Sequence, residues 1–420
     1  MIISLSLSRA CLKTACLKSD RRCFHIGMKN LSETRAARRG CEIMPQGEQI
    51  MTMAERLHAV LRFEQPDRPF FFPTIGFWSE TIQRWHGEGL PKFVFHDVPA
   101  FLYFGFDHWL PFLIGDHELP NLFPPFAPRV LEKKGKYEIF RDHGGKTYKR
   151  FRDGSSSIPQ FLEAPVKTMD DYRALRWRLD PGFPGRCANP VFDLMAAYCK
   201  LRGAPGGMMV SGLFGFHRHL LGVETLMTAY YDMPDLLHAM GRDWARLCRG
   251  CIRRLRKRYG ITLVNFWEDM CFRSGPMISP RAFREFMTPY YKEVISDARD
   301  QGVEFFWVDT DGDCSLVIPL FEEAGVNLLY PFEAQAGMDI VKVRADHPRM
   351  AILGGLDKRA LAKDRAAIEE EVMSKVPAML KSGGYIAALD HTVPPDVPLD
   401  NFKFYLELLK SRELAGHGIA

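Results

Sequence analysis

The chain has 420 residues, of which 46% are hydrophobic and 25% charged, which fits an ordinary globular protein and excludes collagen-like and fully disordered chains. Its formal net charge of +5 resides in residues 1–50, which hold nine Lys or Arg against four Asp or Glu. The remainder is therefore neutral overall and gives no sign of nucleic acid binding. No apolar run approaches the roughly 18–20 residues that span a bilayer, and the ten cysteines are scattered. We expect a cytoplasmic protein with reduced thiols and no membrane contact.

Residues 1–50 lack a sustained apolar period, and we expect a disordered basic extension there. One alternative is a start codon assigned too early, with Met51 or Met53 as the true first residue. A second is a targeting peptide, since the segment is basic and poor in acids. In all three cases the folded protein is residues 51–412, which we interpret as one domain.

The first elements of this domain follow directly. Thr52 and Glu55 have the spacing of a capping box, which predicts a helix over Met53–Phe63. A short apolar run, Phe70–Pro73, indicates a buried strand. Further on, alternating apolar and polar residues around Gly144 and Gly145 predict an inserted β-hairpin made of Tyr137–Phe140 and Thr147–Phe151.

From residue 208 onward, short apolar strands alternate with helical segments. The predicted strands are Met208–Leu213, Leu263–Trp267, Glu304–Val308, Asn327–Tyr330, Ala351–Gly354 and Gly384–Leu389. The predicted helices cover residues 219–258, 279–301, 315–324, 338–346 and 364–382. Strands buried on both faces and followed by helices are typical of parallel sheets. The repetition predicts an α/β fold, a single (β/α)8 TIM-type barrel with a small inserted hairpin.

Charged residues follow several of these apolar strands. In such a barrel the strand ends share one rim, where catalytic loops gather. We therefore expect catalytic residues at this rim, namely Glu268, Asp269, Asp309, Asp311 and His391. Substrate-binding candidates at the strand ends are Phe214, His217, Glu333 and Asp357. An acid at a strand end can instead cap the next helix, which is the expectation for Asp313 and an open alternative for Asp357.

Two kinds of chemistry suit such a rim. Clustered carboxylates raise one another's pKa values, which suits acid/base catalysis near neutral pH. Two carboxylates and an imidazole also match the donors of a divalent metal site, for zinc or another ion. Asp309, Asp311 and His391 are the candidate ligands. The sequence leaves both possibilities open.

Several motifs resemble the uroporphyrinogen decarboxylase superfamily. They are Trp267-Glu268-Asp269-Met270, Ser274-Gly275-Pro276, Asp309-Thr310-Asp311-Gly312, Gly383-Gly384-Tyr385-Ile386 and Val393-Pro394-Pro395-Asp396. The resemblance covers about residues 52–410 and implies a (β/α)8 barrel. It also implies one of two chemistries, cofactor-free decarboxylation of uroporphyrinogen or corrinoid-linked methyl transfer in which zinc activates a thiol.

This sequence departs from both patterns. The decarboxylases carry arginines in the loop after the first strand, whereas residues 73–79 here contain none. The methyltransferases bind zinc through a His-x-Cys pair and a later Cys, and the matching positions here are Asp309, Asp311 and His391. These residues offer carboxylate oxygens and an imidazole nitrogen in place of thiolate sulfur, a set that suits harder metal ions than a thiolate site does.

Our leading hypothesis is methyl transfer between a small methylated substrate and a corrinoid carried by a partner protein. The first alternative is decarboxylation of the kind found in porphyrin biosynthesis, which needs no cofactor. The second is a barrel that binds a small ligand without turnover. The expected partners are a small-molecule substrate, a corrinoid protein if methyl is transferred, and a second copy of the chain if the protein is a homodimer.

Overall fold

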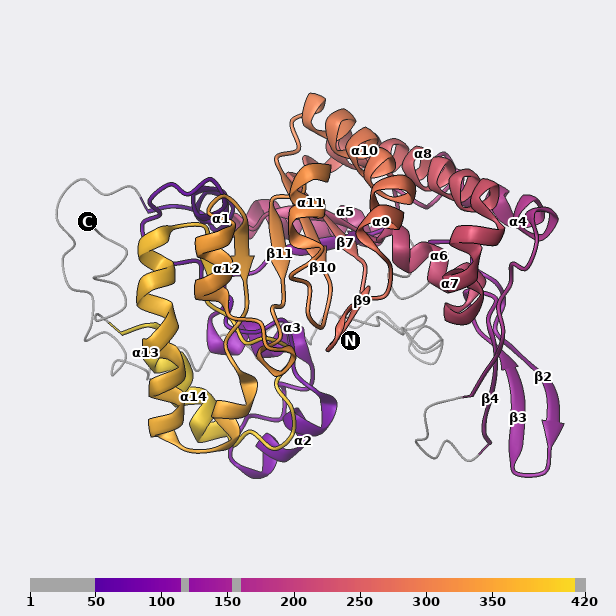
Figure 1. The fold of residues 1–420 in the computed structure, drawn as a ribbon. Helices are drawn as coiled ribbons and strands as arrows, with labels where there is room; N and C mark the ends of the chain where they lie inside the picture. Colours follow the sequence, from indigo (N-terminus) through magenta and orange to yellow (C-terminus); the bar gives the residue numbers. More distant parts are fainter. Residues whose placement is uncertain (1–49, 115–120, 153–159, 412–420) are drawn as a thin grey trace, which may run out of the picture. The chain divides into compact units, whose positions relative to one another are not determined.

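A computed structural model describes residues 50–114, 121–152 and 160–411 (Figure 1). The chain divides into two units, Met1–Ile50 and Met51–Ala420. The predicted basic extension lies outside the described residues apart from Ile50. All the helices and strands of the described residues belong to the second unit.

The centre of this unit is a parallel sheet. Within the described residues it has seven regular strands in the order β1-β6-β7-β10-β11-β12-β13. Their bounds are β1 Leu110–Leu113, β6 Gly206–Ser211, β7 Leu263–Trp267, β10 Phe305–Asp309, β11 Leu328–Tyr330, β12 Ala351–Leu353 and β13 Tyr385–Ile386. The six strands predicted from residue 208 onward are confirmed, most of them within two residues at each end. β1 was not predicted, because its four residues lie in a proline- and aromatic-rich stretch without clear periodicity.

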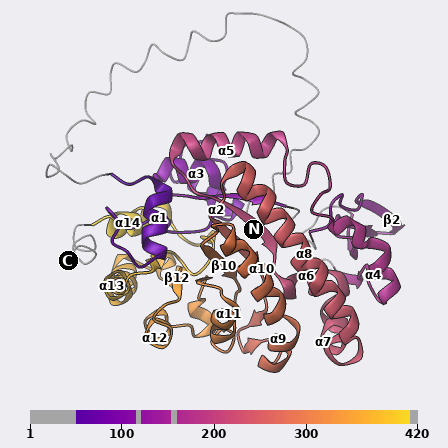
Figure 2. The same cartoon turned by 90° about the horizontal axis from the view of Figure 1, so that it is seen from above.

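Helices cover the outer face of the sheet. Figure 2 shows α8, α10, α11, α12 and α13 following one another around the strands. Alternation explains the packing: in β7, Phe266 points outward and its ring lies 5.7 Å from that of Trp244 in α8 and 5.0 Å from that of Tyr291 in α10. In the same strand Leu263 and Asn265 point to the opposite face, the face turned away from the helices.

The expected strand Phe70–Pro73 is not a regular strand. Its backbone nevertheless bonds to both ends of the sheet: the carbonyl of Phe71 accepts from the amide of Asp107 at 2.8 Å, and that of Pro73 accepts from Leu389 at 2.9 Å. Prolines at 69 and 73 remove two amide donors and prevent a continuous ladder. The regular sheet therefore has one strand fewer than the eight predicted.

Most predicted helices are present, with interruptions. The bounds are α1 Met53–Leu61, α2 Ser79–Gly87, α3 Asp97–Phe104, α4 Met169–Leu175, α5 Pro190–Arg202, α6 Leu213–Leu221, α7 Val223–Asp232, α8 Pro234–Tyr259, α9 Pro280–Phe286, α10 Thr288–Asp300, α11 Ile318–Ala324, α12 Ile340–Asp346, α13 Arg365–Ser382 and α14 Leu399–Leu409, with 3₁₀ turns η1 Arg176–Leu179, η2 Ala334–Ala336 and η3 Lys358–Ala362. The capping box of Thr52 and Glu55 is confirmed. The single helix predicted over 219–258 was wrong: α6, α7 and α8 replace it, because Gly222 adopts a φ of 78° and Pro234 starts a new helix.

The predicted hairpin is confirmed as part of a larger insert. Strands β3 (Tyr137–Arg141) and β4 (Thr147–Phe151) pair antiparallel, and β2 (Arg129–Lys134) and β5 (Gln160–Glu163) extend them to a four-stranded sheet. A further two-stranded ribbon, β8 (Cys271–Phe272) and β9 (Gly275–Pro276), follows β7.

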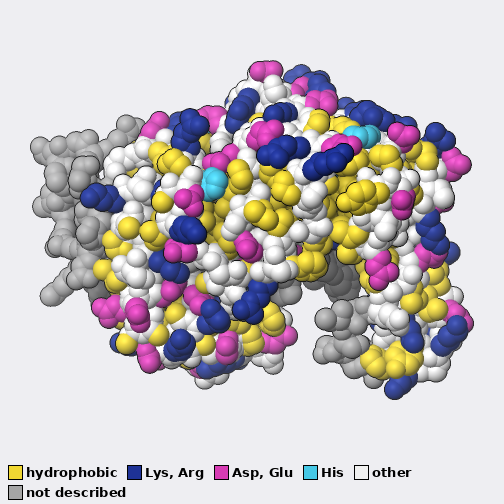
Figure 3. Space-filling model, viewed as in Figure 1, with side chains coloured by type: hydrophobic (Ala, Val, Ile, Leu, Met, Phe, Trp, Pro, Cys, Tyr) yellow, Lys and Arg dark blue, Asp and Glu magenta, His cyan; other side chains and the backbone are white. Residues whose placement is uncertain are grey.

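The described surface mixes both signs of charge. Figure 3 shows Lys and Arg interspersed with Asp and Glu along the edge formed by α8 and α10. Arg249 of α8, for example, pairs with Glu293 and Asp297 of α10. Among the described residues no helix is both long enough and apolar enough to cross a bilayer.

Candidate active site

The polar residues gather where the parallel strands end. Because β7, β10 and β11 run in the same direction, their last residues are neighbours: Asp309 is in register with Trp267 on one side and Tyr330 on the other. The amides of Glu268 and Asp269 both donate to the carbonyl of Asp309, at 2.9 and 3.2 Å. The rim expected from the sequence is thus formed.

Asp309 and Asp311 are the proton-holding groups of this rim. Asp309 is 7% exposed, and no side chain or amide of the described residues donates a hydrogen bond to its carboxylate. Burial, and then the nearby charges of Asp311 and Asp269, raise its pKa well above the usual range. Burial, with Glu333 and Asp269 nearby, raises the pKa of Asp311 to about 7. The pair therefore retains a proton at neutral pH.

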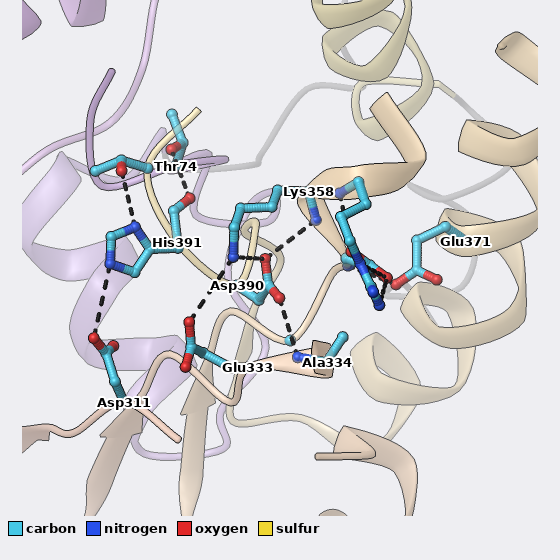
Figure 4. A network of polar contacts seen from close by, with 12 residues as sticks. Thr74, Asp311, Glu333, Ala334, Lys358, Glu371, Asp390 and His391 are labelled. Atoms are coloured by element: carbon cyan, nitrogen blue, oxygen red, sulfur yellow. Dashed lines mark hydrogen bonds and ion pairs between the residues drawn. The ribbon is translucent and has the colours of Figure 1, made fainter. Parts of the chain in front are cut away.

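His391 faces Asp311 and is uncharged. Its Nε2 lies 3.9 Å from Oδ2 of Asp311 (Figure 4). Its Nδ1 is 2.8 Å from Oγ1 of Thr392. Burial, and then the ammonium of Lys358, lower its pKa to about 4. At neutral pH the imidazole can accept one hydrogen bond and donate another.

An ionic network beside His391 was missed by the sequence analysis. Asp390 is fully buried and accepts from the amide of Ala334 at 3.0 Å, the amide of Lys358 at 3.1 Å and the ammonium of Lys358 at 3.3 Å (Figure 4). The same ammonium lies 3.9 Å from Glu333, which in turn accepts from the amide of Gly312 at 3.0 Å. The available signal was the position of Lys358 and Asp390 directly after apolar strand runs.

Glu268 lies beside the rim but serves the start of α6. It is fully buried, and its carboxylate accepts from the amides of Leu213 at 2.9 Å and Gly215 at 3.0 Å, and from the hydroxyl of Tyr291 at 2.5 Å. Burial raises its pKa to about 7, against the opposing effect of these hydrogen bonds. A carboxylate here caps the amide end of a helix whose own cap residue, Gly212, has no side chain. Its expected role in orienting substrate stays a prediction.

Asp269 is held in an unusual backbone conformation, with a φ of 47°. Arg218 of α6 donates to its carbonyl at 2.7 Å and to its carboxylate at 2.9 Å. One third of the side chain remains exposed, so Asp269 faces the rim with its charge partly balanced. Residues in the left-handed region are strained unless their surroundings fix them, and such strain is common at functional sites.

The substrate-binding candidates divide into two groups. Glu333 joins the rim network, whereas Phe214 and His217 have no exposed surface. Burial, and then the proximity of His238, lower the pKa of His217 to about 3, so it is a neutral residue of the core. Substrate contact with Phe214 or His217 would require α6 to move.

Asp357 behaves as a cap. Its carboxylate accepts from the amide of Arg359 at 2.9 Å, at the start of η3, and pairs with the same residue's guanidinium at 2.6 Å. Asp313 likewise accepts from the amide of Ser315 at 3.0 Å. The capping alternative is confirmed for Asp357, the N-cap of η3, but not for Asp313, which bonds within a turn before α11, a helix whose N-cap is Val317.

The candidate metal ligands do not form a complete set. In the part of the chain that the structure describes, no group of three His, Cys, Asp or Glu side chains is arranged to hold a metal ion. Nε2 of His391 lies 3.9 Å from Oδ2 of Asp311. These residues do not fit a metal centre, and we derive no step through one.

Comparison with known proteins places this geometry in a family. Residues 151–412 match the family model of uroporphyrinogen decarboxylase (URO-D). A uroporphyrinogen decarboxylase from Gloeobacter violaceus is 26% identical over 262 residues, covering 60% of this chain and 71% of that protein. One from Trichlorobacter lovleyi is 26% identical over 260 residues, covering 59% and 71%.

One solved structure supports the fold. A methyltransferase from Methanosarcina mazei superposes with a TM-score of 0.53 at 14% sequence identity, over 86% of this chain and 98% of that one. Identity at this level supports the fold alone. The family match over more than half of the sequence leads to one conclusion: the chain belongs to the uroporphyrinogen decarboxylase family.

Proposed function

We propose that this protein is an enzyme that moves a methyl group from a small methylated substrate to a corrinoid on a partner protein. The observation that carries the proposal is the protonated pair Asp309 and Asp311 facing the neutral imidazole of His391. The corrinoid, when bound, supplies the nucleophile that accepts the methyl group. The partner protein and a second copy of this chain remain expectations that follow from the family resemblance.

The carboxyl pair supplies the proton that such a reaction needs. When the bond between the methyl carbon and the substrate's oxygen, nitrogen or sulfur breaks, the electron pair stays on that heteroatom. A proton from Asp309 or Asp311 then neutralises it, and the carboxylate that remains is reprotonated from solvent. General acids of this kind contribute about 10²- to 10⁴-fold to rate.

Charge also favours a substrate without several carboxylates. The cations at the rim are already paired, Lys358 with Asp390 and Arg218 with Asp269. The loop at residues 74–78 contains no arginine to hold further carboxylates. Among the described residues, a polyanionic tetrapyrrole would meet an acidic rim without a free guanidinium.

Decarboxylation of uroporphyrinogen is the second candidate. It is favoured by the names of the curated relatives, both uroporphyrinogen decarboxylases at 26% identity. A carboxyl group with a raised pKa can also protonate the carbon that loses carbon dioxide, so Asp309 would serve either reaction.

We further propose that residues 70–77 complete an eight-membered (β/α)8 barrel. The backbone bonds of Phe71 to Asp107 and of Pro73 to Leu389 support this, as does the parallel bridge between Phe77 and Val393. The segment would then be the irregular first strand, between β1 and the end of β13.

One experiment separates the three functions. The purified protein is incubated with reduced free cobalamin and a panel of methylated phenols, amines and thiols, and methylation is followed by absorbance. A parallel reaction with uroporphyrinogen is analysed for coproporphyrinogen. Methylation by the native protein, reduced about 10²-fold or more in Asp309→Asn but not in the exposed control Asp300→Asn, supports methyl transfer.

Coproporphyrinogen formation with the same dependence on Asp309 would instead establish the decarboxylase. If a panel compound binds but neither assay shows turnover, the barrel that binds a ligand without turnover is the remaining hypothesis. Our proposal would then be wrong.

A further inference from the structure

On the face of the parallel sheet that is turned away from the helices, the side chains form successive layers below the rim. Leu263 of β7, Trp307 of β10 and Leu328 of β11 line one small internal cavity of about 20 Å³, together with Trp109, Leu353 and Ile386. These side chains therefore point inward. Since strand residues two apart share a face, Asn265 and Tyr330 also point inward, one step closer to the rim.

Three polar side chains follow one another from β7 across β10 to β11, Trp307 at the cavity and Asn265 and Tyr330 one step closer to the rim. Asn265 is in register with Trp307, so the two side chains are neighbours across β7 and β10. The rings of Trp307 and Tyr330 lie 6.1 Å apart, and Tyr330 is in register with Asp309. Asn265 is 1% exposed, Trp307 5% and Tyr330 2%, so protein covers almost all of their surface.

These side chains have no protein partner for their polar atoms. Among the described residues, nothing hydrogen-bonds to either amide atom of Asn265, to the indole nitrogen of Trp307 or to the hydroxyl of Tyr330. Buried polar atoms are nearly always bonded in native proteins, to protein, to water or to a ligand. Unpaired polar atoms on three successive neighbours therefore indicate a place for a water molecule or a ligand group.

We propose that Asn265, Trp307 and Tyr330 form a neutral subsite that binds an uncharged, oxygen-bearing group of the substrate. The layer offers the donors of an indole, an amide and a phenol, and one amide acceptor. It contains no cation to neutralise a carboxylate, and Asp309 lies directly beside it.

The subsite explains how a substrate could be aligned for Asp309. Tyr330 is in register with Asp309, so a group held on the phenol hydroxyl leaves the rest of the molecule close to the carboxyl pair. This holds for methyl transfer and for decarboxylation alike. The inference therefore goes beyond the proposed function and does not depend on which reaction occurs.

Binding of a matched pair of probes tests it without turnover. Benzamide carries an uncharged carbonyl oxygen and benzoate a carboxylate on the same ring. Calorimetric titration of the native protein should give a dissociation constant for benzamide at least ten-fold lower than for benzoate. Tyr330→Phe, which removes only the hydroxyl, should weaken benzamide about three- to ten-fold, and Asn265→Leu by about ten-fold or more.

Tyr290→Phe is the control. Its hydroxyl bonds His238 between α8 and α10, away from the strand interior, and benzamide binding should not change. Equal binding by native protein, Asn265→Leu and Tyr330→Phe would mean that the layer holds only water and would overturn the proposal. Tighter binding of benzoate, or no binding of benzamide, would overturn it as well. If Asn265→Leu does not fold, Tyr330→Phe carries the test.

Discussion

Glu268 should make the protein less stable as the pH rises. Its pKa increases from 4.5 to about 7 on folding, so between these values the unfolded chain loses the proton before the folded chain does. Stability is then fully present below about pH 4.5 and falls as the pH rises through about 7. Between pH 5 and pH 8 this single carboxyl should lower the free energy of unfolding by about 2.5 kcal/mol.

The substitution Glu268→Gln isolates the effect. Glutamine keeps the shape and stays uncharged, so its contribution to stability should not vary with pH. Asp309 and Asp311 also have raised pKa values and act in the same direction, but they are present in both proteins and cancel in the difference. Urea unfolding followed by circular dichroism at pH 5, 6, 7 and 8 gives the two curves.

The difference between the curves decides the matter. We expect the native protein to lose about 2.5 kcal/mol relative to Glu268→Gln across this range, with the steepest change below pH 7. A difference that stays constant from pH 5 to pH 8 would refute the reasoning. Glu268 would then be ionised throughout, stabilised by the amides of α6 more strongly than burial opposes it.

Three further substitutions test other parts of the site. Lys358→Met should cost about 3–5 kcal/mol of unfolding free energy, because it leaves Asp390 buried without its cation. Because the ammonium of Lys358 lowers the pKa of His391, NMR titration of this variant should show a higher His391 pKa, and an unchanged value would contradict the network. Gly212→Ala should cost about 1–3 kcal/mol in urea unfolding, because a Cβ there would lie 2.2 Å from the carboxyl carbon that caps α6. Asp357→Ala should cost about 1 kcal/mol through loss of its cap, with KM unchanged, and a raised KM would restore its role in substrate binding.

The sequence was sufficient for the parts of the fold that depend on local patterns. β7 was predicted at Leu263–Trp267 because an apolar run bounded by turn signals has few alternatives. Asp309 and Asp311 could be assigned to a shared rim because parallel strands end at the same edge. Phe70–Pro73 was misread, since its long-range backbone bonds to Asp107 and Leu389 are not visible in an apolar run interrupted by prolines.

The orientation of side chains at the rim could not be predicted. Glu268 and Asp269 are adjacent in sequence, yet one faces the start of α6 and the other the solvent-exposed rim. No role was predicted for Lys358, because only the folded chain brings it to Asp390, 32 residues away. Such distinctions depend on which backbone amides a side chain meets, and that is set by tertiary packing.

The φ of 47° at Asp269 restricts which sequences this rim can accept. Asn, Asp and Gly tolerate that conformation, whereas β-branched residues strongly resist it. A saturation library at position 269 should therefore retain folded members mainly among Gly, Asn and Asp. Position 333 accepts a wider range of residues on this ground, because the backbone of Glu333 follows ordinary geometry while its carboxylate belongs to the same rim.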